Sequence, residues 1–81
     1  MARVVLRKGA SRQLKKLPPS EVKKNSRKLI DIANEPFSGK LLKGEYAGLY
    51  SFRAWPYRII YRIVDQQIEV CAVEHRQGVY K

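Results

Sequence analysis

The sequence predicts a small α+β domain in which two helices near the N-terminus pack on one face of a mainly antiparallel, four-stranded sheet. Three observations predict this fold class. A short β-branched run opens the chain, two proline-bounded segments with helical spacing follow it, and the last third alternates between apolar and polar residues. The expected element order is β-α-α-β-β-β within a single domain, residues 1–81.

The first three elements follow from β-branching and helical spacing. The run "ARVVLR" (2–7) is typical of a strand. Apolar residues recur three and four positions apart in "GASRQLKKL" (9–17), and Pro18 ends that helix. A longer helix is predicted within residues 18–36, because Pro19 suits its first turn and Pro36 follows its end. Its expected apolar stripe comprises Val22, Ser26, Leu29, Ile30 and Ala33.

Three more strands follow a glycine-containing loop at residues 37–48. Their apolar residues alternate with polar ones, which is typical of half-buried strands. Trp55–Pro56 and Asp65–Gln66 are the expected turns, since proline cannot donate to a strand ladder. The strands are "LYSFRA" (49–54), "YRIIYRIV" (57–64) and "IEVCAVEH" (68–75).

Strand alternation assigns the side chains of this sheet to two faces. With two-residue turns, Arg53 faces Arg58 and Arg62 faces Glu69 on an open face. The same register pairs Arg58 with Val73, which places Glu74 on the opposite, helix-covered face. Burial of the apolar side chains strongly favours this register. The residues expected beneath the helices are Tyr50, Phe52, Ile59, Tyr61, Ile63, Ile68, Val70 and Ala72; Ser51, Ile60, Cys71 and His75 are expected on the open face.

Composition excludes several classes of protein. A single cysteine, Cys71, cannot form an internal disulfide, and a single histidine does not allow a Cys/His zinc cluster. No apolar run approaches the roughly 20 residues of a membrane span. The N-terminus has too few apolar residues for a secretory signal, so the expected compartment is the cytoplasm. No metal or cofactor is expected.

The charge points to a polyanionic partner. The chain carries 17 Lys and Arg residues against 7 Asp and Glu, a net charge of +10. Residues 1–28 hold ten of these basic side chains and a single acid, Glu21. Nucleic acid or a nucleoprotein is the favoured partner, because neutralising phosphates releases counterions. An anionic membrane surface and an acidic protein stay open as alternatives, although the helices lack the large apolar face that membrane adsorption requires.

At "YRIIYRI" and "EHRQGVYK" the chain resembles the RelE/ParE superfamily of toxins from toxin–antitoxin systems. The resemblance extends through "LKKLPPSEVKK" and "PFSGKLLKGEYAGLYSFR", and so covers nearly the whole chain. It implies a single RelE-like toxin domain over residues 1–81 and a cognate antitoxin as partner. RelE-like members enter the ribosomal A site and cut messenger RNA without a metal. ParE-like members share the fold and poison DNA gyrase.

The resemblance implies a role for individual residues and favours the RelE-like side. Arg58 matches the arginine of the family's "YR-apolar-apolar-Y" strand, and Arg76 matches the arginine that follows the last strand. Tyr80 matches the C-terminal tyrosine that family members use near the scissile phosphate. Arginine suits the phosphate, because it stays charged and presents a planar fork of donors. Tyr80 would stack on a base or orient the 2′-hydroxyl group of the RNA. The expected supporting or RNA-binding residues are Arg53, Ser51, His75, Trp55, Lys43, Lys15, Lys16, Lys23 and Lys24.

This chain departs from the family pattern at four places. Ser51 stands where many relatives carry a second basic residue, and Trp55–Pro56 replaces a small glycine-containing turn. Glu74 occupies a position that is commonly glycine, and Tyr80 is penultimate. Glu74 is a formal base candidate, but the expected register places it on the wrong face. Arg62 is expected to serve only as the partner of Glu69.

Two other functions stay open at this point. One is a ParE-like gyrase inhibitor, or a member of the superfamily without cleavage activity. The other is a basic RNA-binding domain that is no toxin, for which RNA affinity would fall with salt and growth would continue. The leading prediction is a ribosome-dependent endoribonuclease toxin.

Overall fold

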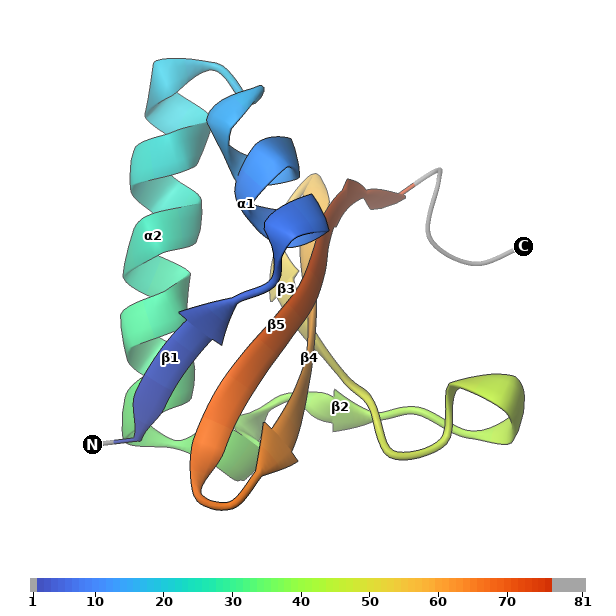
Figure 1. Ribbon diagram of the computed structural model, residues 1–81. Coiled ribbons are helices and arrows are strands. Elements are labelled where there is room, and N and C mark those ends of the chain that lie inside the picture. The colour runs from blue at the N-terminus through green and yellow to red at the C-terminus, as the bar shows by residue number, and fades with distance from the viewer. Residues whose placement is uncertain (1, 77–81) are drawn as a thin grey trace.

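The computed structural model describes residues 2–76 as a twisted sheet with two helices packed on one of its faces (Figure 1). The predicted helices and strands are all present, which confirms the α+β fold. In chain order the elements are β1 (Arg3–Leu6), α1 (Lys8–Lys15), α2 (Pro19–Asn34), η1 (Pro36–Ser38), β2 (Lys40–Leu41), η2 (Gly44–Tyr46), β3 (Tyr50–Ala54), β4 (Tyr57–Val64) and β5 (Gln67–His75).

The sheet has five strands in the order β1-β5-β4-β3-β2 rather than the four predicted. β1 runs parallel to β5, and the other neighbours are antiparallel. The additional strand, β2, consists of Lys40 and Leu41, which pair with Ser51 and Tyr50. A strand of two residues has no alternation to detect, so the sequence pattern indicated only a loop there.

Helix α2 buries part of the expected stripe, since Ala33 is buried and Leu29 packs against the core. Asn25, Ile32 and Ala33 are buried, whereas Ile30 is 54% exposed. The amide Nδ2 of Asn25 donates to the Glu21 carbonyl at 2.8 Å, so a polar side chain occupies the buried stripe by bonding within its own helix. Neither helix among residues 2–76 has the length and apolarity needed to cross a membrane.

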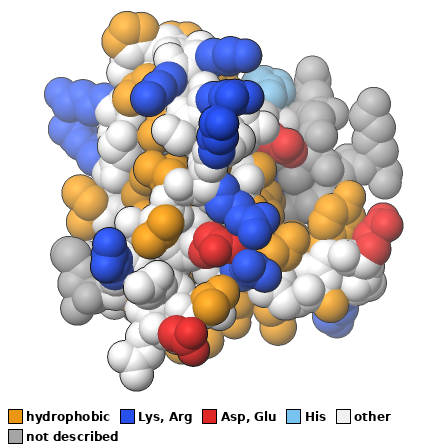
Figure 2. Space-filling view, viewed as in Figure 1, with side chains coloured by type: hydrophobic (Ala, Val, Ile, Leu, Met, Phe, Trp, Pro, Cys, Tyr) orange, Lys and Arg blue, Asp and Glu red, His pale blue; other side chains and the backbone are white. Residues whose placement is uncertain are grey.

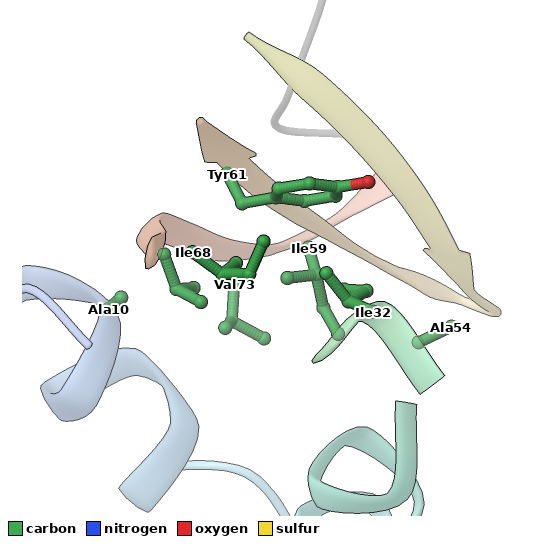
Figure 3. Packing of buried hydrophobic residues seen from close by; sticks show 8 residues of the cluster. Ala10, Ile32, Ala54, Ile59, Tyr61, Ile68 and Val73 are labelled. Carbon is green, nitrogen blue, oxygen red and sulfur yellow. The ribbon is translucent and has the colours of Figure 1, made fainter. Parts of the chain in front are cut away.

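The core lies between the helices and the covered face of the sheet. Figure 3 shows Ile59 from β4 beside Ile32 from α2, with Ala10 from α1 on the side of the cluster where Ile68 from β5 lies. Tyr61, Ile59 and Ile32 have no exposed surface. The buried cluster consists of Ala10, Ile32, Ala54, Ile59, Tyr61, Ile68, Val70 and Val73.

A β-bulge in β5 overturns part of the predicted register. Tyr61 pairs with Val70 but Ile60 pairs with Ala72, so Cys71 is an extra residue in β5. Beyond Cys71 every side chain changes face, which puts Val73 in the core instead of Ala72. The bulge therefore buries the larger of the two side chains, and more apolar surface leaves water.

The Tyr61 hydroxyl group fixes the segment that follows α2. It donates to the Pro36 carbonyl at 2.7 Å and accepts from the Gly39 backbone N–H at 3.1 Å. The Tyr61 ring stacks on Tyr50 with the ring centroids 5.3 Å apart. One side chain thus joins the sheet to the connection between α2 and β2.

Replacing Tyr61 with Phe is expected to lower the free energy of unfolding by about 1–3 kcal/mol, because Gly39 N–H and Pro36 C=O lose their partner. Burial raises the pKa of the Tyr61 phenol above its ordinary value of 10.0. Below about pH 10 the phenol is neutral in the folded and the unfolded protein. Above that pH the phenol ionises more readily in the unfolded protein, which lowers the free energy of the unfolded state, so the free energy of unfolding falls as pH rises. Urea unfolding between about pH 8 and 11 should show this alkaline loss reduced in Tyr61→Phe. An equal slope in both proteins would contradict the expectation.

Candidate functional site

Basic residues from three segments meet at one end of the sheet, where β3 turns into β4 and where β5 ends. Arg53 of β3 pairs directly with Arg58 of β4, as the sequence predicts. Arg76 follows β5, and its backbone N–H donates to the Pro56 carbonyl at 2.8 Å. This bond places Arg76 beside the β3–β4 turn and brings three predicted site residues into one neighbourhood, here called the arginine cluster: Arg53, Arg58 and Arg76.

Trp55 lies at the tip of the β3–β4 turn, in contact with the arginine cluster. Its side chain is 52% exposed. The guanidinium carbon Cζ of Arg76 lies 4.6 Å from the centroid of the Trp55 ring, and that of Arg53 lies 6.0 Å from it. Both distances are within the range at which an indole ring attracts a cation.

Lys24 reaches this site from helix α2. Its Nζ donates to the Trp55 carbonyl and lies 2.8 Å from the Glu21 carboxylate. Lys24 was expected to act with the other lysines on the surface of the helices. The structure places it at the turn instead, where it ties the first half of α2 to the end of the sheet.

Glu74 lies on the open face opposite Arg58, and the prediction that it faces the helices is wrong. The extra residue Cys71 shifts the pairing of β5, so Glu74 takes the place next to Arg58 that was expected for Val73. The site therefore includes a carboxylate beside the arginine cluster. The shift has no clear sequence signal, because Cys71, Ala72 and Val73 are all apolar and either alternation is acceptable.

Gln13 of helix α1 is a site residue that sequence reasoning missed. Its Nε2 lies 3.4 Å from Glu74 Oε1, and its Oε1 accepts from the Val73 backbone N–H at 2.8 Å. β1 pairs with β5 only from Gln67 to Val70, so Gln13 satisfies a backbone donor beyond the end of that ladder. Its position inside a basic helix carried no signal for this contact.

His75 was expected on the open face with the arginine cluster. This prediction is wrong, because its side chain lies on the other face of the sheet. It pairs with Tyr57, and the two rings meet edge to face with centroids 5.5 Å apart. The cause is again the bulge at Cys71, which reverses the facing of each later residue in β5. The side chain is exposed at the end of the strand.

Ser51 was expected at the open surface and is buried instead, with 7% exposure. It lies between Lys40 of β2 and Ile60 of β4 in the sheet, and Ile60 is also buried. The unpredicted strand β2 adds a neighbour on that side of Ser51. Ser51 and Ile60 are therefore both withdrawn from solvent, and Ser51 cannot contribute to an exposed binding surface.

A second charged group lies on the same face of the sheet, farther along β4 and β5. Arg62 Nε and Arg7 Nε lie 2.6 Å and 3.2 Å from Glu69 Oε1. The hydrogen bond to Glu69 raises the pKa of Arg62, and burial raises the pKa of the nearby Cys71 thiol. The predicted Arg62–Glu69 pair is confirmed, and it lies apart from the arginine cluster, four residues farther along β4 than Arg58.

The remaining predicted basic residues are spread over the surface. Lys15, Lys16 and Lys23 are exposed on or beside the helices, and Lys43 is exposed before η2. Figure 2 shows basic side chains over the helical layer and the adjoining sheet on one side of the molecule. A shallow groove along α2 is lined by Ser20, Lys23, Lys24, Arg27, Lys28 and Asp31.

The arrangement at the end of the sheet suits binding of a phosphate group. Guanidinium groups supply paired N–H donors and permanent charge, and an exposed indole ring supplies a stacking surface. Among residues 2–76, no three His, Cys, Asp or Glu side chains gather as metal ligands would. The predicted catalytic residue Tyr80 lies outside the described residues.

Comparison with known sequences places the chain in a toxin family. The family described as "ParE toxin of type II toxin-antitoxin system, parDE" matches residues 4–80. Toxin RelG of Mycobacterium tuberculosis is 37% identical over 76 residues, which cover 89% of this chain and 87% of that relative.

Solved structures agree with this placement. The toxin–antitoxin complex RelBE2 of Mycobacterium tuberculosis contains a chain with 35% identity and a TM-score of 0.86, covering 93% of this chain and 98% of that one. A chain of the intact RelBE complex of E. coli shares the fold, with a TM-score of 0.76. The two chains are 18% identical, and the match covers 93% of this chain and 96% of that one. With its family match, its curated relative and its fold in agreement, this chain belongs to the RelE/ParE superfamily of type II toxin–antitoxin toxins.

Proposed function

We propose that this toxin is a ribosome-dependent, metal-free endoribonuclease that cleaves messenger RNA in the ribosomal A site and thereby arrests translation. The observation that carries the proposal is the arginine cluster. Arg53 and Arg58 pair across two strands, Arg76 joins them from the end of a third, and Trp55 lies exposed beside them. Like charges on facing strand positions destabilise a sheet; Glu74 opposite Arg58 offsets part of that repulsion, and three cations at one end of the sheet favour a phosphate ligand.

In the proposed reaction, the 2′-oxygen of a nucleotide attacks the neighbouring phosphorus while the bond from phosphorus to the 5′-oxygen breaks. The 2′-hydroxyl proton passes to a base, and the leaving 5′-oxygen takes up a proton. Negative charge builds on the phosphate oxygens in between, and preorganised cations stabilise such charge. Arg58 and Arg76 would bind these oxygens, with Arg53 as a supporting cation.

Two side chains compete for the role of base. Tyr80 is one of them, because it matches the tyrosine that the resemblance places near the scissile phosphate. Glu74 gains support from its place opposite Arg58 and from the contact of its Oε1 with Gln13 Nε2. A carboxylate accepts a proton without the large pKa change that a tyrosine requires. We therefore assign Glu74 ahead of Tyr80 as base, and Tyr80 to base stacking or orientation of the 2′-hydroxyl group.

Docking on the ribosome would rely on the basic residues outside the arginine cluster. Lys15, Lys16 and Lys23 on the helical side and Lys43 near η2 would contact ribosomal RNA phosphates. Such binding weakens steeply with salt, because each phosphate contact releases counterions. The toxin would act in the cytoplasm, where ribosomes and messages are found.

A cognate antitoxin is the expected protein partner. The RelBE2 structure from Mycobacterium tuberculosis and the RelBE structure from E. coli are described as toxin–antitoxin complexes. An antitoxin for this chain would present an acidic or amphipathic segment to the basic helices or to the arginine cluster, since the toxin carries a net charge of +10.

Induced expression followed by mapping of messenger RNA ends tests the proposal. New ends should appear within coding regions, at a fixed position within codons, because cleavage takes place on a ribosome that holds the reading frame. A reporter message whose start codon is removed is the matched control and should stay intact. New ends on that untranslated message, or growth arrest without any new ends, would overturn the proposal.

A ParE-like gyrase inhibitor is the second candidate. It is favoured by the family match, whose description names the ParE toxin. Expression would then produce gyrase–DNA cleavage complexes and a DNA-damage response while messages stay whole. The other alternative is a RelE-fold protein that binds RNA but does not cleave it. It predicts RNA binding that weakens with salt, without growth arrest on expression.

A further inference from the structure

Trp55 is the point where two guanidinium groups meet, because Arg53 from β3 and Arg76 from just beyond β5 both lie against its indole ring. Arg76 Cζ is 4.6 Å from the ring centroid and Arg53 Cζ is 6.0 Å from it. The ring belongs to the turn between β3 and β4, so it stands between the end of β3, which carries Arg53, and the residue that follows β5. The turn itself is anchored on both sides, by Lys24 Nζ at the Trp55 carbonyl and by the Arg76 N–H at the Pro56 carbonyl.

Bringing arginines together requires compensating attractions, and Glu74 opposite Arg58 supplies one of them. Arg53 already faces Arg58 across the sheet, and Arg76 adds a third positive charge to the same end. The face of an indole ring carries partial negative charge and attracts each guanidinium group that approaches it. A guanidinium group that lies on a ring uses its plane for this contact, so the N–H donors at its edge stay available for phosphate oxygens.

We propose that Trp55 is a positioning residue that holds Arg76 and Arg53 as a pair for binding one phosphodiester of an unpaired RNA strand. The inference rests on the proposed function, which assigns both arginines to phosphate. Trp55 acts through the two arginines. Its ring holds both guanidinium groups in position in the free protein, so that the phosphate binds to N–H donors that are already oriented. This assigns a role to the Trp55–Pro56 turn, which the family pattern does not explain.

The test is a double-mutant cycle on RNA affinity. A labelled single-stranded RNA with a 2′-deoxy group at the cleavage position binds without being cut, and fluorescence anisotropy gives its Kd. Trp55→Leu should weaken binding roughly 5- to 30-fold, because two exposed cation–π contacts are lost. Trp55→Phe keeps an aromatic face and should recover much of that loss. In an Arg76→Ala background, Trp55→Leu should have a clearly smaller effect than in the parent protein.

The matched control is the same cycle with Arg62→Ala, because Arg62 lies on the same face of β4 and is paired with Glu69. Trp55→Leu and Arg62→Ala should be additive. Circular dichroism and thermal unfolding should show that each variant folds, as expected for an exposed turn residue. Equal effects of Trp55→Leu with and without Arg76, or no rescue by phenylalanine, would overturn the proposal.

A spectroscopic measurement tests the same contact without any substitution at Trp55. Trp55 is the single tryptophan of the chain, so the intrinsic tryptophan fluorescence of the protein comes from this site. Arg76→Ala should change the emission of the free protein, and addition of the 2′-deoxy RNA should change that of the parent. Unchanged emission in both cases would overturn the inference. Since neither binding nor fluorescence requires cleavage, failure of the proposed nuclease activity would be seen separately, in the mapping of messenger RNA ends.

Discussion

Replacing Arg58 with alanine is expected to reduce cleavage of a ribosome-bound message by roughly a hundredfold to a thousandfold, because a preorganised donor to the transition-state charge is lost. Arg58 is the central member of the arginine cluster. It pairs with Arg53 on one side and with Glu74 on the other, and so lies next to both the supporting cation and the proposed base. Single-turnover cleavage on purified, programmed ribosomes measures the rate of the chemical step.

Arg62→Ala is the control for that experiment. Arg62 comes from the same strand and the same face, four residues farther along, and its Nε lies 2.6 Å from Glu69 Oε1. The total charge changes equally in the two variants, so a general loss of RNA attraction would affect both. We expect Arg62→Ala to cleave within a few-fold of the parent. Equal losses in the two variants would show that net charge, and not the cluster, determines the rate.

Replacing Gly39 with alanine is expected to lower the free energy of unfolding by about 1–3 kcal/mol, the usual cost of overpacking a filled site. A Cβ at Gly39 would lie 2.5 Å from the Tyr61 hydroxyl oxygen and 3.0 Å from the ring atom Cε1. The hydroxyl group cannot move aside, because it is bonded to the Pro36 carbonyl and to the Gly39 N–H. Chemical denaturation at neutral pH measures the difference.

Two further variants show whether the clash is the cause. Gly9 lies in the first turn of α1, where an added Cβ meets nothing within 4 Å, so Gly9→Ala should stabilise the protein by about 0.5–1 kcal/mol. In a Tyr61→Phe background the nearest atom is removed, and Gly39→Ala should cost less than in the parent. An undiminished cost there would mean that the ring atoms of residue 61, and not the hydroxyl group, oppose the substitution.

Local patterns in the sequence predicted the main elements of the fold well. Helices α1 and α2 and strands β1, β3, β4 and β5 all lie where spacing and proline positions indicate, since each feature acts over a few residues. The pairing of Arg53 with Arg58 followed from a two-residue turn at Trp55–Pro56. The pairing of Arg62 with Glu69 followed in the same way from the turn at Asp65–Gln66. Both pairs lie close to their turns, before any irregularity can shift the register.

The site was less predictable because it depends on contacts between distant segments. Glu74 and His75 were assigned to the wrong faces, since a single extra residue at Cys71 reverses the alternation and leaves no mark in the sequence. Ser51 was expected at the surface, and the two-residue strand β2 beside it escaped detection. Gln13 reaches β5 across 60 and 61 positions of sequence, a separation at which no periodicity operates.

By itself, the sequence determined the superfamily, the order of helices and strands, the excess of positive charge and the identity of the arginines that face outward. The superfamily follows from the resemblance of the quoted motifs to a known family, and the other features depend on composition and short-range patterns, which folding does not alter. Only the tertiary structure decided that Arg76 and Arg53 share the ring of Trp55, that Glu74 lies beside Arg58, and that Lys24 belongs to the turn. Each of these depends on where β5 shifts its register and where α2 crosses the sheet, and both are settled by packing of the whole core.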